Sequence, residues 1–582
     1  MKNILRTHKN KEKKDKKEDN PKIRAIKFNI LAIVAIVIFC MSLCPITLQN
    51  DTYYTIKIGE HIVNTKTVDM QDSFSWHENM PYTYPHWAYD VIIYLIYNAF
   101  GLMGIFISTI ILACVLGVLM YFTNCKISKN KPISFLITIG AMYLMKDYIA
   151  ARAQLVTFIL LELTILLIEK FLETKKVRYP IGIVLISIAI ANLHCAVWPF
   201  FFVIFLPYIA EYLIFTIIDA EPIYKIKQKI YDTRIKIYNK LLKKKEEKYT
   251  EKINKTITKK EEAIEDHKKF IENQKNRREN PYRIKYEKNK ATKWLILVMV
   301  ICAFTGLLTP LGDTPYTYLY KTMQGNTTEN ISEHLPLTLI NAKEILVTLV
   351  AVLVILLFTD TKIRLKDLFM LAGLALLMLM TRRQVSMFVL FGSAIIAKLI
   401  ADLFRKYDNR GLVELEKIMV STLGIIAVIS ITALLAIFEM QPKVEDKFVR
   451  ESSYPVNAAT YITENLDLNS IKLFNEYNYG SYLIFRGIPV FIDSRADLYA
   501  PEFNKIENSE DAELAKGRDI FSDYIGVSTI SRYYEKVFEK YDITHMILSK
   551  KSKLNMLVEK DNRYNKIYSD DYFAIYERNK GE

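Results

Sequence analysis

Residues 28–59 read FNILAIVAIVIFCMSLCPITLQNDTYYTIKIG, an uncharged run followed by a polar and aromatic one. The first part, 28–44, carries no charge and approaches the roughly 20 residues that a helix needs to cross a bilayer. The second part begins with Asn50 and Asp51, directly beyond the point at which such a helix would leave the hydrocarbon. The stretch therefore predicts a membrane anchor that leads into a folded loop at the membrane surface.

Similar uncharged runs recur along the chain, and charge is concentrated between them. The protein has 582 residues, of which 51% are hydrophobic and 24% are charged. Segments 295–308 and 345–358 lack charge, whereas 2–27 and 223–293 are dense in it. We therefore predict a polytopic α-helical membrane protein with about eleven spans, placed at 28–47, 100–123, 133–146, 155–172, 181–197, 199–218, 294–310, 344–359, 367–381, 384–402 and 418–438.

The distribution of lysine and arginine predicts the orientation of these spans. Basic residues of membrane proteins collect in cytoplasmic loops, so the N-terminus and the basic loops share one side: 126–131, 175–178, 219–293, 362–366 and 405–410. The bilayer accounts for the formal net charge of +15, and no nucleic-acid partner is expected. We predict a multi-pass protein of the cell membrane whose extracytoplasmic segments are 49–99, 147–153, 311–342 and 439–582.

The chain divides into a basic cytoplasmic tail (1–27), a membrane domain (28–438) and a C-terminal extracytoplasmic domain (439–582). Within the membrane domain, 219–293 mixes Lys and Glu around a few isoleucines. This insert predicts a charged helical hairpin, either a solvated spacer or a helix pair that lies on anionic lipid. In the C-terminal domain, β-prone runs alternate with helical ones, which indicates a small α/β domain. Its expected strands are 471–474, 482–485, 489–492, 545–548 and 572–576, and its expected helices are 455–465 and 532–541.

The first outer loop, 49–99, contains candidates for chemistry. Loops longer than about 12–15 residues are usually functional or disordered, and the aromatic and acidic content of this loop argues against disorder. Asp51, Asp72 and His86 are its candidate site residues, although Asp51 also suits a helix cap or an interfacial polar group. Asp69 and Asp72 leave room for a divalent cation, Mg²⁺ or Mn²⁺, without a complete ligand set.

Further ionisable residues are predicted at the same outer level. Such residues are costly near a membrane and are often functional. Each also has a simpler explanation: His194 suits a helix–helix hydrogen bond, and Arg383 suits a side chain that snorkels to the interface. The predicted topology places the whole set on one side of the membrane: Arg152, His194, Glu333, His334, Arg382 and Arg383.

Carboxylates beside arginines at a membrane surface suit the transfer of a sugar from a lipid phosphate. The leaving phosphate needs a positive partner, which Arg, Lys or a metal ion supplies. The accepting hydroxyl needs a carboxylate base, and a nearby carboxylate stabilises the oxocarbenium-like transition state. Asp51 as the base, with Arg152, Arg382 or Arg383 on the phosphate, would meet these demands.

Short stretches form a pattern that extends over most of the chain: 51–59 (DTYYTIKIG), 72–75 (DSFS), 86–87 (HW), 152–154 (RAQ), 191–194 (ANLH), 309–312 (TPLG), 331–334 (ISEH), 475–483 (NEYNYGSYL) and 489–499 (PVFIDSRADLY). This pattern resembles the GT-C superfamily of polyprenyl-phosphate-sugar-dependent glycosyltransferases, and more narrowly a bacterial group within or near it. The resemblance implies a GT-C-like helical domain followed by an extracytoplasmic α/β domain. The sequence departs from the group at His86, where an acidic residue is expected before the tryptophan.

The stretch 493–497 (DSRAD) follows an apolar run, so Asp493, Arg495 and Asp497 would share one face of an extended segment. They form either a polar lip that contacts a glycan or lipid head group, or an Asp–Arg–Asp ion pair that holds the end of a strand. Replacing Arg495 with Ala separates the two interpretations, because a lip residue affects activity and a structural ion pair affects stability.

These features predict a membrane glycosyltransferase that moves a sugar from a polyprenyl-phosphate-linked donor to an extracytoplasmic envelope glycan, lipid or protein. One alternative is a transporter or flippase of lipid-linked sugars, which predicts charges at the bilayer midplane and inverted repeats. Another is a non-catalytic envelope-assembly protein. The expected partners are the bilayer, the donor lipid and the acceptor, and a divalent cation is the one cofactor that the sequence leaves open.

Overall fold

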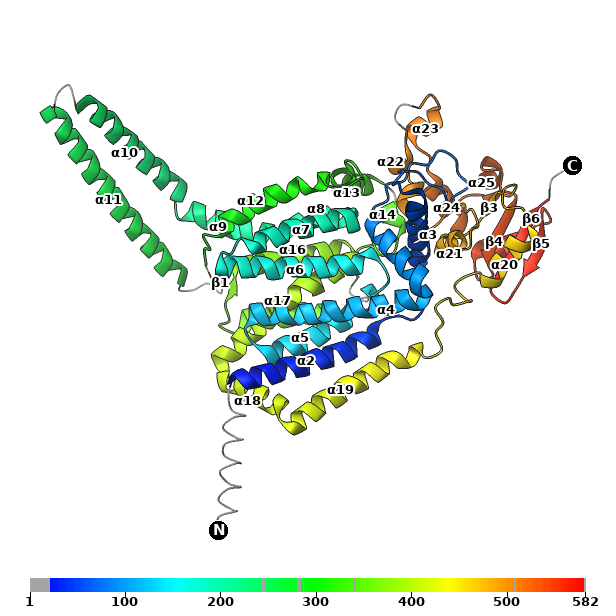
Figure 1. Ribbon diagram of the computed structural model, residues 1–582, viewed down its shortest axis with the longest axis horizontal. Helices are drawn as coiled ribbons and strands as arrows, with labels where there is room; N and C mark the ends of the chain where they lie inside the picture. Colours follow the sequence, from blue (N-terminus) through cyan, green and yellow to red (C-terminus); the bar gives the residue numbers. More distant parts are fainter. Residues whose placement is uncertain are drawn as a thin grey trace, which may run out of the picture.

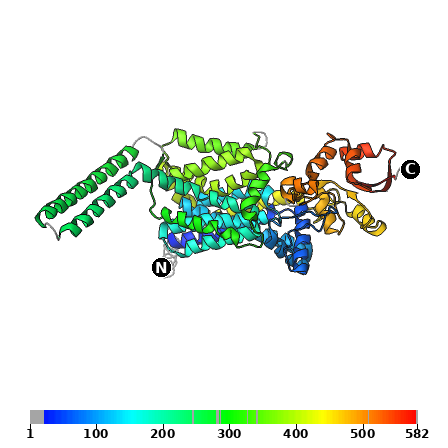
Figure 2. The same ribbon diagram turned by 90° about the horizontal axis from the view of Figure 1, so that it is seen from above.

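The computed structural model describes residues 21–242, 246–279, 284–285, 287–325, 327–338, 342–506 and 509–579. Roughly parallel helices form a bundle in the middle of the molecule (Figure 1). A helical hairpin projects from one end of the bundle, and the C-terminal region lies against the other end; Figure 2, seen at 90°, shows the same order. Most of the predicted basic tail, residues 1–20, lies outside the described residues.

The bundle contains every predicted span as a helix or, for 199–218, as a pair of helices. Five stretches of the described chain are long and apolar enough to cross a membrane: Pro21–Leu43, Trp87–Ser128, Cys195–Ile218, Arg382–Tyr407 and Thr422–Lys443. The bundle helices are α2 (Pro21–Leu43), α4 (Trp87–Ser128), α5 (Lys131–Leu144), α6 (Ala153–Thr174), α7 (Arg178–Leu193), α8 (Trp198–Val203), α9 (Leu206–Ile218), α12 (Thr292–Ala303), α15 (Lys343–Phe358), α16 (Leu365–Met380), α17 (Val385–Tyr407), α18 (Asn409–Val420) and α19 (Thr422–Met440).

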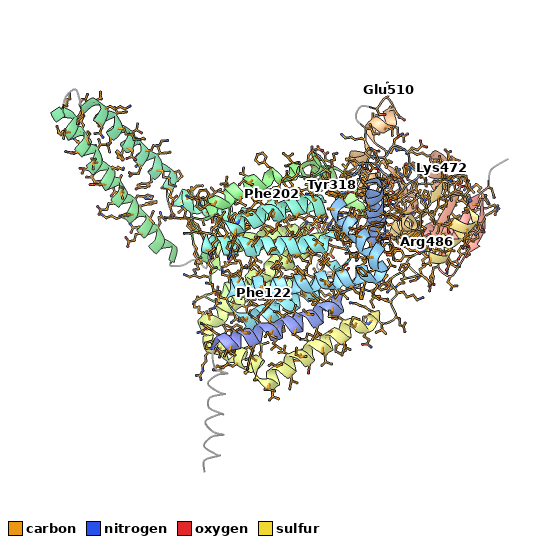
Figure 3. All side chains as sticks on the ribbon, in the orientation of Figure 1. Phe122, Phe202, Tyr318, Lys472, Arg486 and Glu510 are labelled. Carbon is orange, nitrogen blue, oxygen red and sulfur yellow. The ribbon has the colours of Figure 1, made fainter. Side chains whose placement is uncertain are left out.

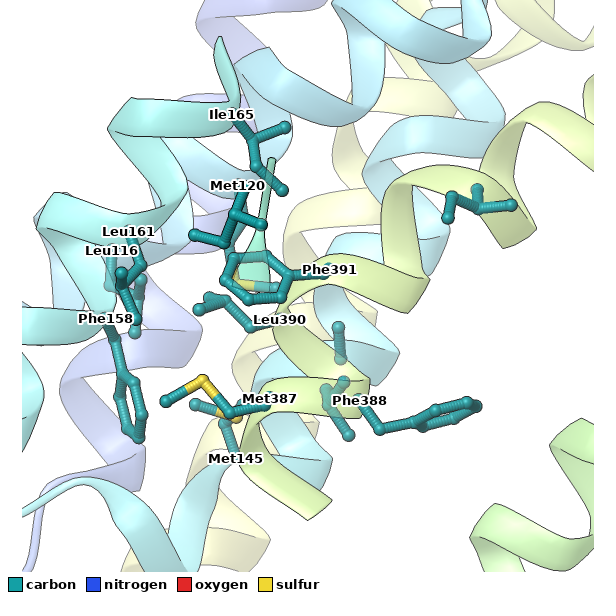
Figure 4. Packing of buried hydrophobic residues seen from close by; sticks show 14 of the residues in the cluster. Leu116, Met120, Met145, Phe158, Leu161, Ile165, Met387, Phe388, Leu390 and Phe391 are labelled. Carbon is teal, nitrogen blue, oxygen red and sulfur yellow. The ribbon is translucent and has the colours of Figure 1, made fainter. Parts of the chain in front are cut away.

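The bundle is apolar both inside and outside. Phe158 of α6 and Phe388 and Phe391 of α17 belong to its buried core, in which bulky side chains interdigitate between helices (Figure 4). Large apolar side chains also cover the outer surface; Leu423 is 81% exposed and Val347 is 68% exposed. Contiguous exposed apolar surface of this kind is typical of helices that face lipid.

The C-terminal region contains a four-stranded sheet in the order β3-β4-β6-β5. The strands β3 and β4 are parallel, and the other two pairs are antiparallel. The elements of this region are β3 (Leu473–Phe474), β4 (His545–Ser549), β5 (Tyr564–Ser569), β6 (Phe573–Arg578), α20 (Val456–Asn465), α21 (Tyr477–Phe485), α22 (Pro501–Asn504), α23 (Ala512–Lys516), α24 (Ile520–Ser528), α25 (Tyr534–Lys540) and α26 (Lys553–Val558).

Two of the expected strands differ in the structure. Segment 482–485 is helical, as part of α21, because Tyr479, Tyr482 and Leu483 are buried at helical spacing. Segment 489–492 forms an isolated bridge between Val490 and Ser75 of the first outer loop. The chain continues beyond it as a loop and a 3-10 turn at Ala496–Tyr499, so the expected extended segment at 493–497 is also wrong.

The first outer loop and the C-terminal region share one apolar core. Residues of the loop helix α3 (Asn50–Thr65) pack in the same buried cluster as α21 and the sheet. The indole nitrogen of Trp76 donates to the carbonyl of Leu473 at 3.0 Å. Gly59 of α3 lies so close to α4 that a Cβ would meet the carbonyl oxygen of Asp90 at 2.1 Å. The loop therefore folds together with the C-terminal region, and we call the two together the outer region.

The hairpin at the opposite end consists of α10 (Glu221–Leu241) and α11 (Glu246–Glu279), which pack against each other. It projects well beyond the bundle in both views (Figures 1 and 2). Two short parallel strands, β1 (Ile284–Lys285) and β2 (Ile363–Arg364), lie near its base.

Candidate functional site

A cavity of about 410 Å³ lies where the bundle meets the outer region. Tyr318 of α13 (Thr314–Gln324), which lines it, is labelled at this junction in Figure 3. Nine of the residues predicted as site residues line this cavity: Asp51, His86, Arg152, His194, Glu333, His334, Arg383, Arg495 and Asp497. Three others do not: Asp72, Arg382 and Asp493. The structure therefore brings together residues from six separate parts of the sequence.

Asp51 and Arg152 form an ion pair on the cavity wall. Asp51 lies in the first turn of α3, where the helix dipole favours a negative charge. Arg152 directly precedes α6, and its Nη2 atom is 2.5 Å from Asp51 Oδ2. The second terminal nitrogen of Arg152 lies 3.5 Å from Glu333 Oε1. The side chains of Asp51 and Arg152 are 24% and 28% exposed, so a ligand can reach both charges.

His86 and His194 form a second group next to this pair. His86 Nδ1 lies 2.6 Å from Asp90 Oδ1, and its Nε2 lies 3.0 Å from the hydroxyl of Tyr54. Burial lowers the pKa of His86, but the carboxylate of Asp90 outweighs burial and raises the pKa above its ordinary value. Where the resembled group has an acidic residue before the tryptophan, this chain has His86. The carboxylate of Asp90 lies next to the imidazole ring of this histidine. His194 Nδ1 lies 2.9 Å from the hydroxyl of Thr157.

The turn at Arg382 and Arg383 is fixed to the loop that carries Glu333. The backbone N–H of Arg383 donates to the Glu333 carbonyl at 3.0 Å, and that of Arg382 donates to Leu335 at the same distance. Arg383 lines the cavity, whereas Arg382 lies outside the lining. Burial, reinforced by Arg383, lowers the pKa of His334 below its ordinary value.

Arg495 is held between two carboxylates. Its Nη1 donates to Asp72 Oδ1 at 2.6 Å, and its Nη2 donates to Asp493 Oδ2 at 2.7 Å. The side chains of Asp72 and Asp493 are 0% exposed, and that of Arg495 is 1% exposed. The ring of Tyr82 lies under the guanidinium, with its centroid 5.0 Å away. Arg495 lines the cavity, and the triad joins the first outer loop to the C-terminal region.

Asp497 faces the cavity beside this triad. The hydroxyl of Tyr318 donates to its carboxylate. Burial raises the pKa of Asp497 above its ordinary value. The two aspartates of the 493–497 stretch therefore differ, since Asp493 binds Arg495 and Asp497 binds a tyrosine from the bundle side.

Asp69 and Asp72 have separate partners. Asp69 contacts His61 at 2.8 Å and accepts from Tyr84 at 2.8 Å, whereas Asp72 binds Arg495. Across the part of the chain that the structure describes, no three His, Cys, Asp or Glu side chains are grouped as metal ligands. The divalent cation stays a prediction.

Some lining residues were not among the predicted site residues. Tyr54, Tyr318, Tyr477 and Asn478 line the cavity with polar side-chain atoms. Tyr54 and Tyr477 occur in two of the quoted stretches, so the signal was present as aromatic residues next to candidate acids. Gly480 of the same stretch is required by packing, since a Cβ there would meet the carbonyl oxygen of Ile492 at 2.1 Å.

Comparison with solved structures places this chain in a known fold. It matches the archaeal oligosaccharyltransferase AglB from Archaeoglobus fulgidus, in complex with an inhibitory peptide and a dolichol-phosphate, with a TM-score of 0.51. The two sequences are 12% identical, and the match covers 90% of this chain and 69% of that one. The apo form of the same enzyme matches with a TM-score of 0.49 at 11% identity, over 91% of this chain and 70% of that one.

No protein-family model matches the sequence, and no curated protein matches it. The chain shares its fold with an archaeal oligosaccharyltransferase, which confirms the predicted resemblance at the level of the fold.

Proposed function

We propose that this protein is a GT-C-type glycosyltransferase that transfers a sugar from a polyprenyl-phosphate-linked donor to an acceptor outside the membrane. The observation that carries the proposal is the Asp51–Arg152 ion pair, partly exposed in a cavity at the end of an apolar helical bundle. A base and a phosphate-binding cation are adjacent there, and both are open to a substrate.

In the proposed reaction, Asp51 accepts the proton of the acceptor hydroxyl as its oxygen forms a bond to the anomeric carbon. The bond from that carbon to the phosphate oxygen breaks, and its electron pair leaves with the lipid phosphate. Arg152 and Arg383 bind the phosphate and stabilise its charge. A Mg²⁺ or Mn²⁺ ion at the carboxylates would supply the same electrostatic stabilisation.

The ion pair implies an exchange of partners on donor binding. In the free protein Arg152 binds Asp51 and lies near Glu333. Arrival of a phosphate gives Arg152 a more highly charged partner and frees the Asp51 carboxylate to accept a proton. Because both side chains are partly exposed, this exchange costs less than breaking a fully buried ion pair would.

The proposal also includes the orientation of the protein in the membrane and the classes of donor and acceptor. About eleven spans with a cytoplasmic N-terminus would place the cavity and residues 439–582 outside, and the 219–293 insert inside. The related fold was solved with a dolichol-phosphate and an inhibitory peptide bound, which supports a lipid phosphate donor. The acceptor class proposed here is an envelope glycan, a lipid or a protein.

The test is mass spectrometry of lipid-linked sugars and envelope glycans from a deletion strain and from the same strain with the wild-type gene restored. A transferase predicts that one sugar disappears from the glycans while its lipid-linked donor accumulates, and that restoration reverses both. A transporter predicts that the donor stays on the cytoplasmic face, inaccessible to an externally added glycosidase. Unchanged glycans would contradict the proposal.

A further inference from the structure

A second concave surface lies at the end of the bundle opposite to the cavity. It is an apolar groove of about 660 Å³ between α7 and α12, two helices in contact with each other. Its walls include Ile181 and Leu185 of α7 and Leu297 of α12. These side chains are 55%, 60% and 50% exposed, so the groove has an unfilled apolar interior. We name this surface the α7–α12 groove.

Three lysines surround one end of the groove: Lys175, Lys290 and Lys293. Lys175 follows the end of α6, and the other two lie at the start of α12, near the base of the hairpin. Trp294 lines the groove beside them, with Lys293 Nζ 5.1 Å from the centroid of its ring. Tryptophan and lysine together are typical of a helix end at the membrane–water interface.

Two neighbouring lysines are neutralised by carboxylates: Lys366 Nζ lies 2.7 Å from Glu169, and Lys288 Nζ lies 2.7 Å from Glu221. Among the residues with described side chains, none of the three groove lysines forms an ion pair. Their charge is therefore available to a ligand, and it is combined with apolar walls.

We infer that the α7–α12 groove binds an anionic glycerophospholipid of the surrounding leaflet. Its acyl chains would lie along Ile181, Leu185 and Leu297, and its phosphate would contact the three lysines. The groove opens at its lysine end onto a polar recess that Asn289 and Glu287 line. The recess leaves room for a glycerol head group beside the lysines.

The chemistry favours this occupant over the donor lipid. The cavity with Asp51 lies at the other end of α7, where Leu193 leads into His194. A donor bound in the groove would hold its sugar a full membrane thickness away from that cavity. Basic residues on the predicted cytoplasmic side contribute about 1 kcal/mol each to binding of anionic lipid, which makes three clustered lysines a substantial site.

The test uses the full-length protein in detergent, titrated with phosphatidylglycerol or phosphatidylcholine and examined by native mass spectrometry. The variant K175Q/K290Q/K293Q is expected to bind phosphatidylglycerol at least about tenfold more weakly, with phosphatidylcholine binding unchanged. K175R/K290R/K293R keeps the charges and is expected to bind like the wild type. L185W/L297W keeps the lysines, fills the groove and is expected to reduce binding of both lipids.

The matched control is K227Q/K229Q/K236Q, which removes the same charge from the exposed surface of α10. Equal loss in this control would overturn the inference, because binding would then follow total charge. Displacement of phosphatidylglycerol by soluble glycerol 3-phosphate would show a free-phosphate site, and tighter binding of a polyprenyl phosphate would assign the groove to the donor lipid. Either result would contradict the proposed occupant.

Discussion

Two arginine–carboxylate groups tie the first outer loop to distant parts of the chain, and they differ in burial. In the triad, Arg495, Asp72 and Asp493 are at most 1% exposed. In the cavity pair, Asp51 and Arg152 are 24% and 28% exposed. A buried charge is stable only while its partners stay in place, whereas a partly exposed pair can exchange a partner for a ligand at a lower cost. The same residue types therefore hold the fold together in one region and, in the function that we propose, bind the substrate in the other.

The largest effect is expected from breaking the triad. Replacing Arg495 with Ala leaves two buried carboxylates uncompensated, which should destabilise the outer region by about 3–5 kcal/mol. Thermal unfolding of the detergent-solubilised protein measures the loss. R450A is the matched control, because it removes an exposed arginine that pairs with Asp446 and should cost under about 0.5 kcal/mol. A stable R495A protein without activity would instead make Arg495 a substrate-binding residue.

A second test of the buried region uses pH. The ring Nε2 of His77 lies 2.9 Å from the carbonyl oxygen of Phe491, and burial lowers the pKa of His77 to about 4. The unfolded chain takes up this proton near pH 6.5, so stability should fall by about 3 kcal/mol as pH decreases from 6.5 to 4. Melting temperatures across this range should show a flatter profile in H77Q, which keeps the donor without titrating. If the melting temperature fell equally steeply with pH in the wild type and in H77Q, the pH dependence could not be assigned to His77.

For Arg152 of the partly exposed pair, we expect a large loss of activity and a small loss of stability. R152A should slow sugar transfer by about 10–100-fold because the lipid phosphate loses a cation, while the melting temperature changes by a few degrees at most. R152K should recover part of the rate but lack the planar two-nitrogen contact. A fall in stability as large as that of R495A would place Arg152 with the structural triad.

The smallest effect is expected from Glu333. Its side chain is 52% exposed and lies 3.5 Å from Arg152. E333Q should change the transfer rate less than about threefold, measured with membranes that contain equal amounts of protein. A much larger loss would mean that this carboxylate contacts the substrate or a metal ion.

The helices and much of the cavity could be predicted from the sequence. A bilayer requires long apolar runs, and each predicted span corresponds to helix in the bundle. Polar residues at the outer ends of these runs had to lie at one level, which is why Arg152, His194 and Arg383 meet in the cavity.

The arginine partners of the aspartates in the first outer loop could not be predicted from the sequence. Asp72 and Arg495 are separated by 423 positions, and their contact depends on how the outer loop packs on the C-terminal region. Asp51 and Asp72 look alike in sequence, since both follow polar residues in an aromatic loop. Burial distinguishes them, and burial is a property of the folded chain. The same reason explains why 482–485 was wrongly expected to be a strand.

The most direct test of the account compares D51N with E60Q, a matched carboxylate-to-amide change on the same helix whose partner is Lys57. Each variant is expressed in the deletion strain at wild-type levels, and lipid-linked sugars and envelope glycans are quantified by mass spectrometry. The account predicts that D51N resembles the deletion, with the donor accumulated and the sugar missing, while E60Q restores the wild-type pattern. Full restoration by D51N would contradict the role of Asp51 as the base.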